Sequence, residues 1–402
     1  MFAQVQELHS WLQPYYQQFI TTLLQGRLTS SIIISGHEGL GGNELALAMA
    51  QFYLCHHPSE HGACGTCSSC QMFKRLTHQV VGVAYATNAD EFDKNLDFID
   101  DMMGLMARKP SATRRSLRVD TMRKVTNFLN ESAVSGGRGK VVIIHGAQLM
   151  GEGAANAILK TFEEPSPNSL IIMTTTSLEA LLPTILSRAS KIVLREVPVD
   201  EAVAYLLNHD NQKPWVPHFS FDFEGKEADY DSRLAAALED CKGLKEPIGV
   251  ERAQIALSLN SYAPLAAMQM LLAGDDLQVA NVVNSIAQYV QSQVQWHSAQ
   301  KKPLRTEFGR EVITSMRKLA KPLQERLLSE LLLETLKYKA NVPVDELPLI
   351  NYGRATCLES LQVDHIFAAM DKLRFIADRS PLIPSRASQA LLRTWLQRLS
   401  AP

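Results

Sequence analysis

The sequence predicts an α/β domain with a P-loop-like parallel sheet, followed by helical domains. Short apolar runs without polar alternation occur within the first 196 residues, as expected for parallel strands that are buried on both faces. A glycine-rich loop follows the first of these runs and precedes a helical pattern. Beyond residue 196 the strand-like runs fade and helical periodicity dominates. The predicted strands are residues 31–35, 140–145, 169–175 and 191–194.

Helical patterns separate the predicted strands. Between residues 154 and 164, apolar side chains recur at i, i+3, i+4 and i+7, which places them on one helical face, and Pro165 ends this helix. Asp120 is the predicted N-cap of an earlier helix, because its carboxylate can accept hydrogen bonds from the first free N–H groups. Helices that alternate with parallel strands predict a doubly wound domain.

The helical remainder of the chain predicts two further domains. The expected domains span residues 1–196, 197–275 and 276–402. Two insertions interrupt them, one at 88–118 and one at about 208–231. The first has an acidic half followed by a basic half, which favours an amphipathic excursion on the surface. Alternatively, its arginines Arg114, Arg115 and Arg118 contact a nucleic-acid backbone.

Composition and charge are those of an ordinary soluble globular protein. The chain has 402 residues, 46% hydrophobic and 20% charged, with a formal net charge of −2. This balance gives no global basic signature for nucleic acid. No apolar run reaches the ~18 residues that a membrane span needs. The first residues lack the basic and apolar regions of a signal peptide, so the expected location is the cytoplasm, away from membranes.

The stretch GHEGLGGN, residues 36–43, has the setting of a phosphate-binding loop. A working loop reads G-x-x-x-x-G-K-[ST], in which the lysine neutralises phosphate charge and the hydroxyl binds Mg²⁺. Here Gly42 replaces the lysine and Asn43 replaces the hydroxyl residue. The candidate loop residues are Gly36, Gly39, Gly41, Gly42 and Asn43. Their backbone could still form a weak anion site, but the loop is predicted to be degenerate and non-functional.

A second element of nucleotide chemistry is missing as well. An ATPase needs an acidic residue at the end of a later strand, to hold Mg²⁺ and to direct water. After the strand at 140–145 the sequence continues from His145 to Gly146, where an Asp-Glu pair is expected. Productive binding of ATP and Mg²⁺ is therefore not expected. A chance run of glycines is the alternative interpretation of the loop.

Four of the six cysteines fall within residues 55–70. Cys55, Cys64, Cys67 and Cys70 read C-x8-C-x2-C-x2-C, and C-x2-C turns place two thiolates on one side of a metal. Four thiolates form a closed tetrahedral site, which predicts structural zinc. The alternatives are a redox dithiol, a chance cluster of free thiols, or replacement of one cysteine by a nearby histidine. The histidines concerned are His56, His57 and His61.

Two strings resemble a known family. AANAILKTFEEPSPNSLIIMTTT and LLPTILSRAS are similar to motifs of the AAA+ clamp-loader subunits of bacterial DNA polymerase III, as is the four-cysteine insert. The resemblance covers residues 1–83 and 119–196, and both insertions depart from the pattern. Loss of the lysine and of the acidic pair is similar to the δ′ branch of this family, in contrast to the ATP-hydrolysing γ/τ branch.

The resemblance implies roles for particular residues and domains. Ser187 and Arg188 match the S-R-C motif, whose arginine reaches into the nucleotide site of a neighbouring subunit, although Ala189 replaces the cysteine. Leu265 stands where family ATPases carry a nucleotide-sensing arginine. The resemblance also implies that residues 197–275 form a helical lid domain and that residues 276–402 form an oligomerising collar domain.

The implied function is that of a non-hydrolysing clamp-loader subunit. Such a subunit belongs to the DNA polymerase III holoenzyme, a nucleotidyltransferase complex. The implied partners are γ/τ ATPase subunits, the δ subunit and, through the complex, the β sliding clamp and primed DNA without sequence preference. Two alternatives stay open at this point. One is an active ATPase with an unusual loop, and the other is a zinc-containing DNA-binding subunit of a repair or recombination complex.

Overall fold

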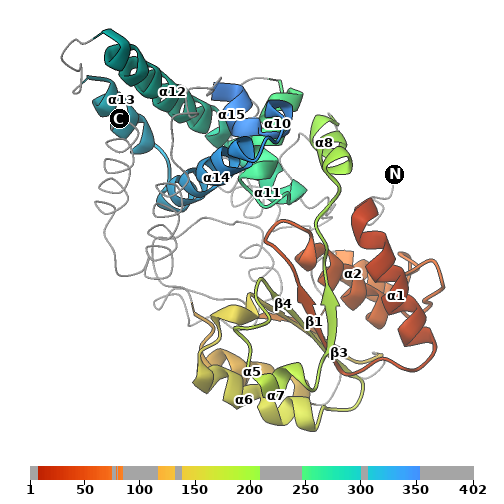
Figure 1. Ribbon diagram of the computed structural model, residues 1–402. Coiled ribbons are helices and arrows are strands. Elements are labelled where there is room, and N and C mark those ends of the chain that lie inside the picture. Colours follow the sequence, from red (N-terminus) through yellow and green to blue (C-terminus); the bar gives the residue numbers. More distant parts are fainter. Residues whose placement is uncertain are drawn as a thin grey trace, which may run out of the picture. The chain divides into compact units, whose positions relative to one another are not determined.

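The protein forms two compact units, which divide between Val197 and Pro198 (Figure 1). The structure, a computed structural model, describes residues 8–74, 78, 80–84, 116–131, 138–208, 247–299 and 307–353. Most of both predicted insertions and the end of the predicted collar lie outside these residues. The division of the helical part into lid and collar stays a prediction.

The first unit is built on a five-stranded parallel sheet in the order β2-β3-β4-β1-β5. Its strands are β1 (Ser31–Ser35), β2 (Val81–Ala84), β3 (Lys140–His145), β4 (Ser169–Thr175) and β5 (Ser190–Val193). The register pairs Ser35 with Thr175, and His145 with Thr174, so the carboxyl ends of β1, β3 and β4 meet at one edge. The predicted parallel α/β domain is confirmed. The short strand β2 is an addition to the predicted strands.

Helices cover both faces of this sheet. The helical elements of the unit are η1 (Ser10–Leu12), α1 (Gln13–Leu24), α2 (Gly42–Leu54), α3 (Ser68–Lys74), α5 (Val119–Asn130), η2 (Ala147–Leu149), α6 (Glu152–Glu163) and α7 (Pro183–Leu186). Helix α2 contacts β1, β3 and β4, and α1 packs on α2. Helices α5 and α6 lie on the opposite face, with α7 beside α6 (Figure 1).

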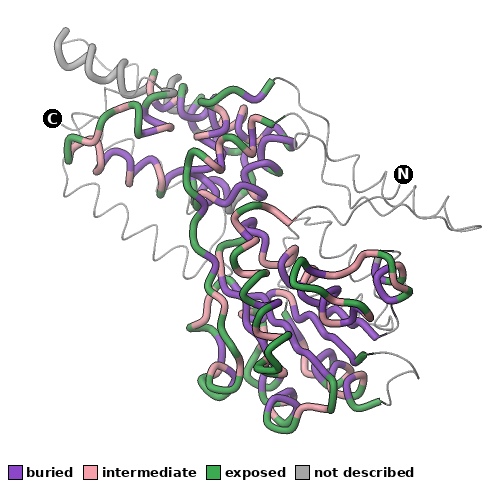
Figure 2. The backbone as a smooth tube through the Cα atoms, turned by 90° about the vertical axis from the view of Figure 1, so that its right-hand side faces the viewer, coloured by how far each residue is buried: buried purple, intermediate pink, exposed green. Residues whose placement is uncertain are grey.

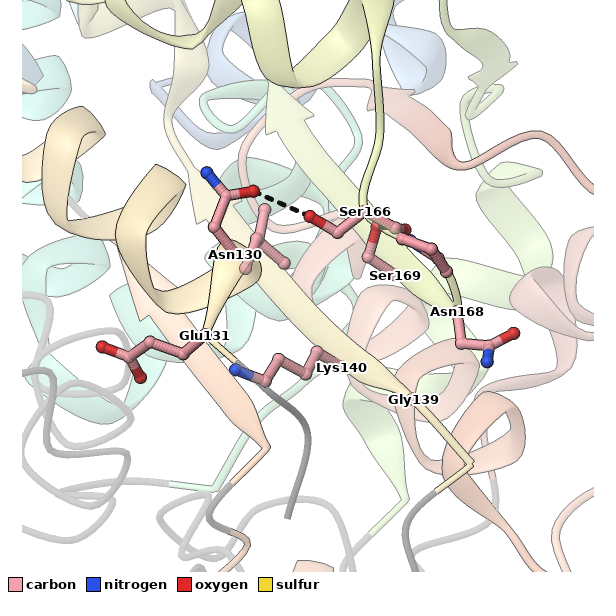
Figure 3. A pocket seen from close by; sticks show the side chains of 9 residues that line it. Asn130, Glu131, Gly139, Lys140, Ser166, Asn168 and Ser169 are labelled. Atoms are coloured by element: carbon pink, nitrogen blue, oxygen red, sulfur yellow. Dashed lines mark hydrogen bonds between the residues drawn. The ribbon is translucent and has the colours of Figure 1, made fainter. Parts of the chain in front are cut away.

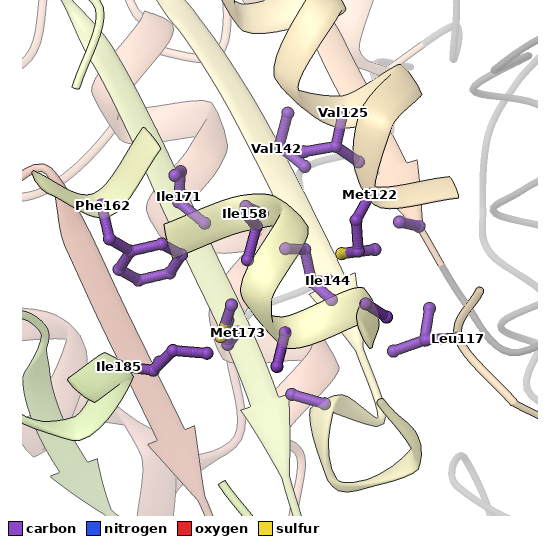
Figure 4. Close-up of a cluster of buried hydrophobic side chains, with 14 of the residues drawn as sticks. Leu117, Met122, Val125, Val142, Ile144, Ile158, Phe162, Ile171, Met173 and Ile185 are labelled. Carbon is purple, nitrogen blue, oxygen red and sulfur yellow. The ribbon is translucent and has the colours of Figure 1, made fainter. Parts of the chain in front are cut away.

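The core beneath α5 and α6 fixes where α6 ends. Met122 of α5 and Ile158 of α6 are fully buried against Ile144 and Met173 of the central strands (Figure 4). Phe162, the residue before the last of α6, is buried in the same cluster. Because burial of each large apolar side chain contributes about 1.5–3 kcal/mol, these residues determine where α6 packs on the sheet. The polar residues that follow Phe162 are thereby brought beside α7.

The prediction that Asp120 caps a helix is wrong by two positions. Helix α5 begins at Val119, and its N-cap is Arg118, whose backbone is extended with φ −89° and ψ 158°. The reason is tertiary: Leu117, just before the cap, forms an isolated parallel bridge with Met150. Asp120 therefore lies in the first helical turn, where its carboxylate accepts a 3.2 Å hydrogen bond from Arg123.

The regular elements in the described residues of the second unit are all helices. Its elements are α8 (Val199–Leu207), α10 (Val250–Ser258), α11 (Pro264–Ala273), α12 (Asp275–Ala299), α13 (Glu307–Met316), α14 (Lys321–Lys339), η3 (Val344–Glu346) and α15 (Pro348–Gly353). Buried residues recur along these helices (Figure 2). Among the described residues, no helix combines the length and apolar character needed to cross a membrane.

Two buried carboxylates join helices of the second unit. Asp276, at the start of α12, accepts a 2.6 Å hydrogen bond from Nε of Arg252 on α10. Glu334 of α14 is 1% exposed and accepts hydrogen bonds of 3.0 Å from the backbone N–H groups of Leu349 and Ile350. Glu334 thus satisfies free N–H groups at the start of α15, which is what a capping side chain does.

Candidate functional site

The glycine loop connects β1 with α2 as the sequence predicts, and backbone geometry favours glycine at two of its positions. Gly39 and Gly41 have φ of 89° and 98°, in the left-handed region that favours glycine. A Cβ on Gly41 would lie 2.6 Å from Cδ1 of Leu12, a fully buried side chain. Gly42 differs, because a Cβ there would meet Ile34 and Leu194 at 3.6 and 3.8 Å, which is ordinary contact. The position of the missing lysine is therefore not sterically closed.

Residues from the start of the chain hold the loop in place. The indole Nε1 of Trp11 donates a 2.9 Å hydrogen bond to the carbonyl of Leu40. His9 stacks on Trp11 with 4.5 Å between the ring centroids. Leu40, within the loop, and Leu12 are both buried. The loop conformation thus has packing partners of its own and needs no bound phosphate to define it.

Asn43 and His145, at the positions where a working loop is expected to have its Mg²⁺ ligands, are hydrogen-bonded to each other. Asn43 begins α2 one residue after Gly42, and its Oδ1 lies 2.8 Å from Nδ1 of His145, at the end of β3. Thr174, near the end of β4, donates a 3.1 Å hydrogen bond to the same Oδ1 and lies 3.0 Å from Nδ1 of His145. With Oδ1 as acceptor, Nδ1 carries the hydrogen. The amide of Asn43 and the imidazole of His145, both in contact with the Thr174 hydroxyl, therefore lie where a working loop is expected to have its hydroxyl and carboxylate.

The four cysteines come together as a group suited to a metal. Their Sγ atoms all lie within 4.8 Å of one another, and those of Cys55 and Cys67 are 4.0 Å apart. A Zn–S distance of about 2.3 Å implies sulfur–sulfur distances of about 3.8 Å in a tetrahedron, so the arrangement fits zinc. The backbone N–H groups of Cys64 and Cys67 donate to neighbouring cysteine sulfurs at 3.2 and 3.4 Å. None of the four is in a disulfide, and the described cluster contains cysteine ligands alone.

Ionisation of these thiols also favours a cation at the centre of the cluster. Burial raises the pKa of Cys55 and of Cys70. Burial opposes ionisation of Cys64 too, but hydrogen bonds donated to its sulfur by the N–H groups of Thr66 and Cys67 lower its pKa to about 5. Metal ligation requires thiolates, so a dication between the sulfurs would supply the stabilisation that burial removes.

The cysteine module is tied to the rest of the unit by polar contacts. Arg138 donates a 2.7 Å hydrogen bond to the carbonyl of Cys55, from a position just before β3. The hydroxyl of Ser69 donates to the carbonyl of Leu54 at 2.8 Å and lies 2.9 Å from Nε2 of the buried His78. These contacts fix the module against α2, as a structural metal site requires.

Arg188 lies directly after α7, and its guanidinium is held within its own chain. Nη1 donates to the carbonyl of Thr184 at 3.1 Å and to the hydroxyl of Ser187 at 3.3 Å. Nη2 forms a 3.0 Å ion pair with Oε1 of Glu163, and the two side chains are 38% and 50% exposed. Sequence reasoning missed Glu163, although it belongs to the EEP string that carries the family resemblance.

The family-model match falls in the half of the chain that contains these groups. Residues 11–198 match the model of the family described as DNA polymerase III, delta subunit. DNA polymerase III subunit delta′ of Escherichia coli K12 is 33% identical over 198 residues, 49% of this chain and 52% of that protein. This half of the chain is similar to the delta-prime subunits of DNA polymerase III. The chain spans about half the length of the E. coli relative.

Other relatives extend the comparison with the delta-prime family. Subunit delta′ of Pseudomonas aeruginosa is 29% identical over 281 residues, 69% of this chain and 67% of that protein. DNA polymerase III subunit tau/gamma of Haemophilus influenzae is 27% identical over 202 residues, 48% of this chain and 25% of that protein. The family-model match, residues 11–198, contains the glycine loop, the cysteine cluster and Arg188. Leu265 lies outside these residues, in α11, and is buried there.

A pocket of about 230 Å³ lies at the amino ends of β3 and β4, away from the glycine loop at the carboxyl ends of the strands (Figure 3). Polar side chains of Asn130, Ser166 and Ser169 line it, and Ser166 donates a 2.8 Å hydrogen bond to Asn130. Lys140 also lines the pocket, and its Nζ is bonded to the carbonyl of Phe128. Ligands of open parallel sheets bind at the carboxyl ends of the strands, so this pocket is not the nucleotide position of the fold.

Proposed function

We propose that this protein is a non-hydrolysing, delta-prime-type subunit of a bacterial clamp loader. The assembly would use ATP in its γ/τ subunits to load the β sliding clamp onto primed DNA. Similarity to the delta-prime subunits supports the assembly. The observation that carries the non-hydrolysing role is the hydrogen-bonded group of Asn43, His145 and Thr174 at the magnesium position.

The chemical argument concerns charge. Phosphoryl transfer builds negative charge on the phosphate oxygens and needs a lysine, Mg²⁺ and an oriented water to stabilise it. Gly42 provides no cation, and neither Asn43 nor His145 provides a carboxylate. Their mutual hydrogen bonds would have to break before a metal could enter. The loop therefore has a structural role, and contacts with Trp11 and Leu12 hold its conformation.

Arg188 supplies the function that remains. An arginine near an intersubunit surface can stabilise the γ-phosphate of a neighbouring subunit during hydrolysis, as arginine fingers do. The side chain is 38% exposed on the described surface, with Ser187 as a direct support of the guanidinium. In this proposal the chain hydrolyses nothing itself but completes the ATP site of one γ/τ neighbour.

Zinc is the proposed cofactor, with a structural role. Cys55, Cys64, Cys67 and Cys70 would hold it, and when bound it would cross-link the loop between α2 and α3. Since all four positions are thiolates, no open position remains for substrate or water. The side chains of Arg138 and Ser69 hold this loop against its neighbours independently.

The wider assembly is part of the same proposal. The partners are γ/τ subunits, the δ subunit and, through the complex, the β clamp and primed DNA. Residues 197–275 would act as a lid and 276–402 as the collar through which subunits associate. The proposed location is the cytoplasm, where replication takes place in bacteria.

The decisive experiment is ATP hydrolysis by the purified chain and by a loader reconstituted with γ/τ and δ. The chain alone should show no turnover above a contaminant control, whereas the complete loader should hydrolyse ATP and place clamps on primed DNA. Gly42→Lys is the informative variant, because a Cβ at this position meets only ordinary contacts but the magnesium ligands are still missing, so turnover should stay absent. Steady hydrolysis by the purified wild-type chain would contradict the proposal.

A further inference from the structure

The guanidinium of Arg188 is fixed at one end and open at the other. Nη1 is occupied by the carbonyl of Thr184 and the hydroxyl of Ser187, and Nη2 by the carboxylate of Glu163. Within the part of the chain that the structure describes, Nε of Arg188 contacts no acceptor. A guanidinium presents five N–H donors in a rigid fork, so three contacts leave Nε–H and one hydrogen of Nη2 for an incoming oxyanion.

Glu163 is poorly placed to stabilise its own helix. It is the last residue of α6, where the carbonyl end of the helix dipole disfavours a negative side chain. Its side chain is 50% exposed, so it makes no contribution to the core. The adjacent Glu164 is also exposed and forms no ion pair within the described chain. The contact that distinguishes the two acids is the ion pair with Arg188.

We propose that Glu163 is a positioning residue for Arg188, and this inference rests on the proposed function of Arg188. An exposed arginine side chain samples many rotamers and loses rotamer entropy when it is fixed. By binding Nη2 beforehand, Glu163 reduces the number of rotamers that the Arg188 side chain samples before a neighbouring nucleotide binds. It leaves the Nε edge free, so the finger can be held by Glu163 and contact phosphate at the same time.

The expected size of the effect follows from the exposure of the pair. Exposed ion pairs shift conformational equilibria by a factor of about two to five, so Glu163→Gln should lower the stimulated hydrolysis rate by about that factor. The fall should appear in kcat with the KM for ATP unchanged, because an arginine finger acts mainly in the transition state. Loss of the finger itself, in Arg188→Ala, should lower the rate further.

The test uses loaders reconstituted with wild-type chain or with one of four variants. The variants are Glu163→Gln, Glu164→Gln, Arg188→Ala and the double variant Glu163→Gln/Arg188→Ala. Glu164→Gln is the matched control, since it removes one exposed charge from the neighbouring position, and it should match wild type. Gel filtration and thermal melting confirm equal assembly and folding. In the background of Arg188→Ala, loss of Glu163 should have no further effect, because a positioning residue acts only through its partner.

The outcomes separate this inference from the proposed function. If Arg188→Ala leaves hydrolysis unchanged in an assembled loader, the trans-acting arginine is wrong and the role of Glu163 is wrong with it. If Arg188→Ala lowers the rate while Glu163→Gln behaves as Glu164→Gln, only the positioning role is wrong. A higher rate in Glu163→Gln would also overturn it, because the carboxylate would then compete with the phosphate for the guanidinium.

Discussion

Replacement of Gly41 by alanine should destabilise the first unit, although the loop is not expected to bind nucleotide. The backbone at Gly41 has φ 98° and ψ 23°, which costs a residue with a Cβ about 1–3 kcal/mol. The new Cβ would also lie 2.6 Å from Cδ1 of the fully buried Leu12, and such overpacking costs about 1–3 kcal/mol more. The sum, about 2–6 kcal/mol, corresponds to a fall in Tm of roughly 5–20 °C for a unit of this size.

The control is Gly42→Ala, one residue further along the same loop. Gly42 is the first residue of α2, and a Cβ there meets its nearest neighbour at 3.6 Å. Alanine favours a helix over glycine by up to about 1 kcal/mol, so this variant should be as stable as wild type or more stable. Thermal and urea unfolding followed by circular dichroism measure both variants. Equal stability of Gly41→Ala and wild type would refute the reasoning that packing has preserved this loop.

Three further predictions concern the metal, the finger and the second unit. Metal analysis of the purified protein should give about one zinc per chain, and Cys67→Ser should release it and lower Tm, whereas a metal-free protein with disulfide-bonded cysteines would contradict the site. Arg188→Lys should restore only part of the hydrolysis lost in Arg188→Ala within a reconstituted loader, because an ammonium lacks the planar fork of a guanidinium; full restoration would mean that charge alone suffices. Burial raises the pKa of Glu334 to about 7 from an ordinary value of 4.5, so the folded protein binds more protons between these values. Stability should therefore fall as pH rises from about 4.5 to 7, and urea unfolding against pH should show a weaker dependence in Glu334→Gln.

The sequence was sufficient wherever a signal is local. Apolar runs of five to seven residues predicted β1, β3 and β4, whose residues are almost all buried, because parallel strands covered on both faces have no polar side. The run at 191–194 also predicted a buried strand, but β5 lies at the edge of the sheet and is mostly exposed. The four cysteines were predicted as one group from their spacing alone, since short turns bring such thiols together. The missing lysine at Gly42 was equally visible, because a loop motif is read along one short stretch of chain.

Tertiary structure decided the contacts between distant positions. Asn43 bonds to His145 and Thr174, which are 102 and 131 positions away, and only the parallel register of β3 and β4 brings the latter two side by side. The start of α5 depends on the bridge of Leu117 to Met150, which no capping pattern encodes. Likewise, Glu163 meets Arg188 because Phe162 seats the end of α6 in the core. Residue types determine what each side chain can do chemically, but the burial of apolar surface determines which of them meet.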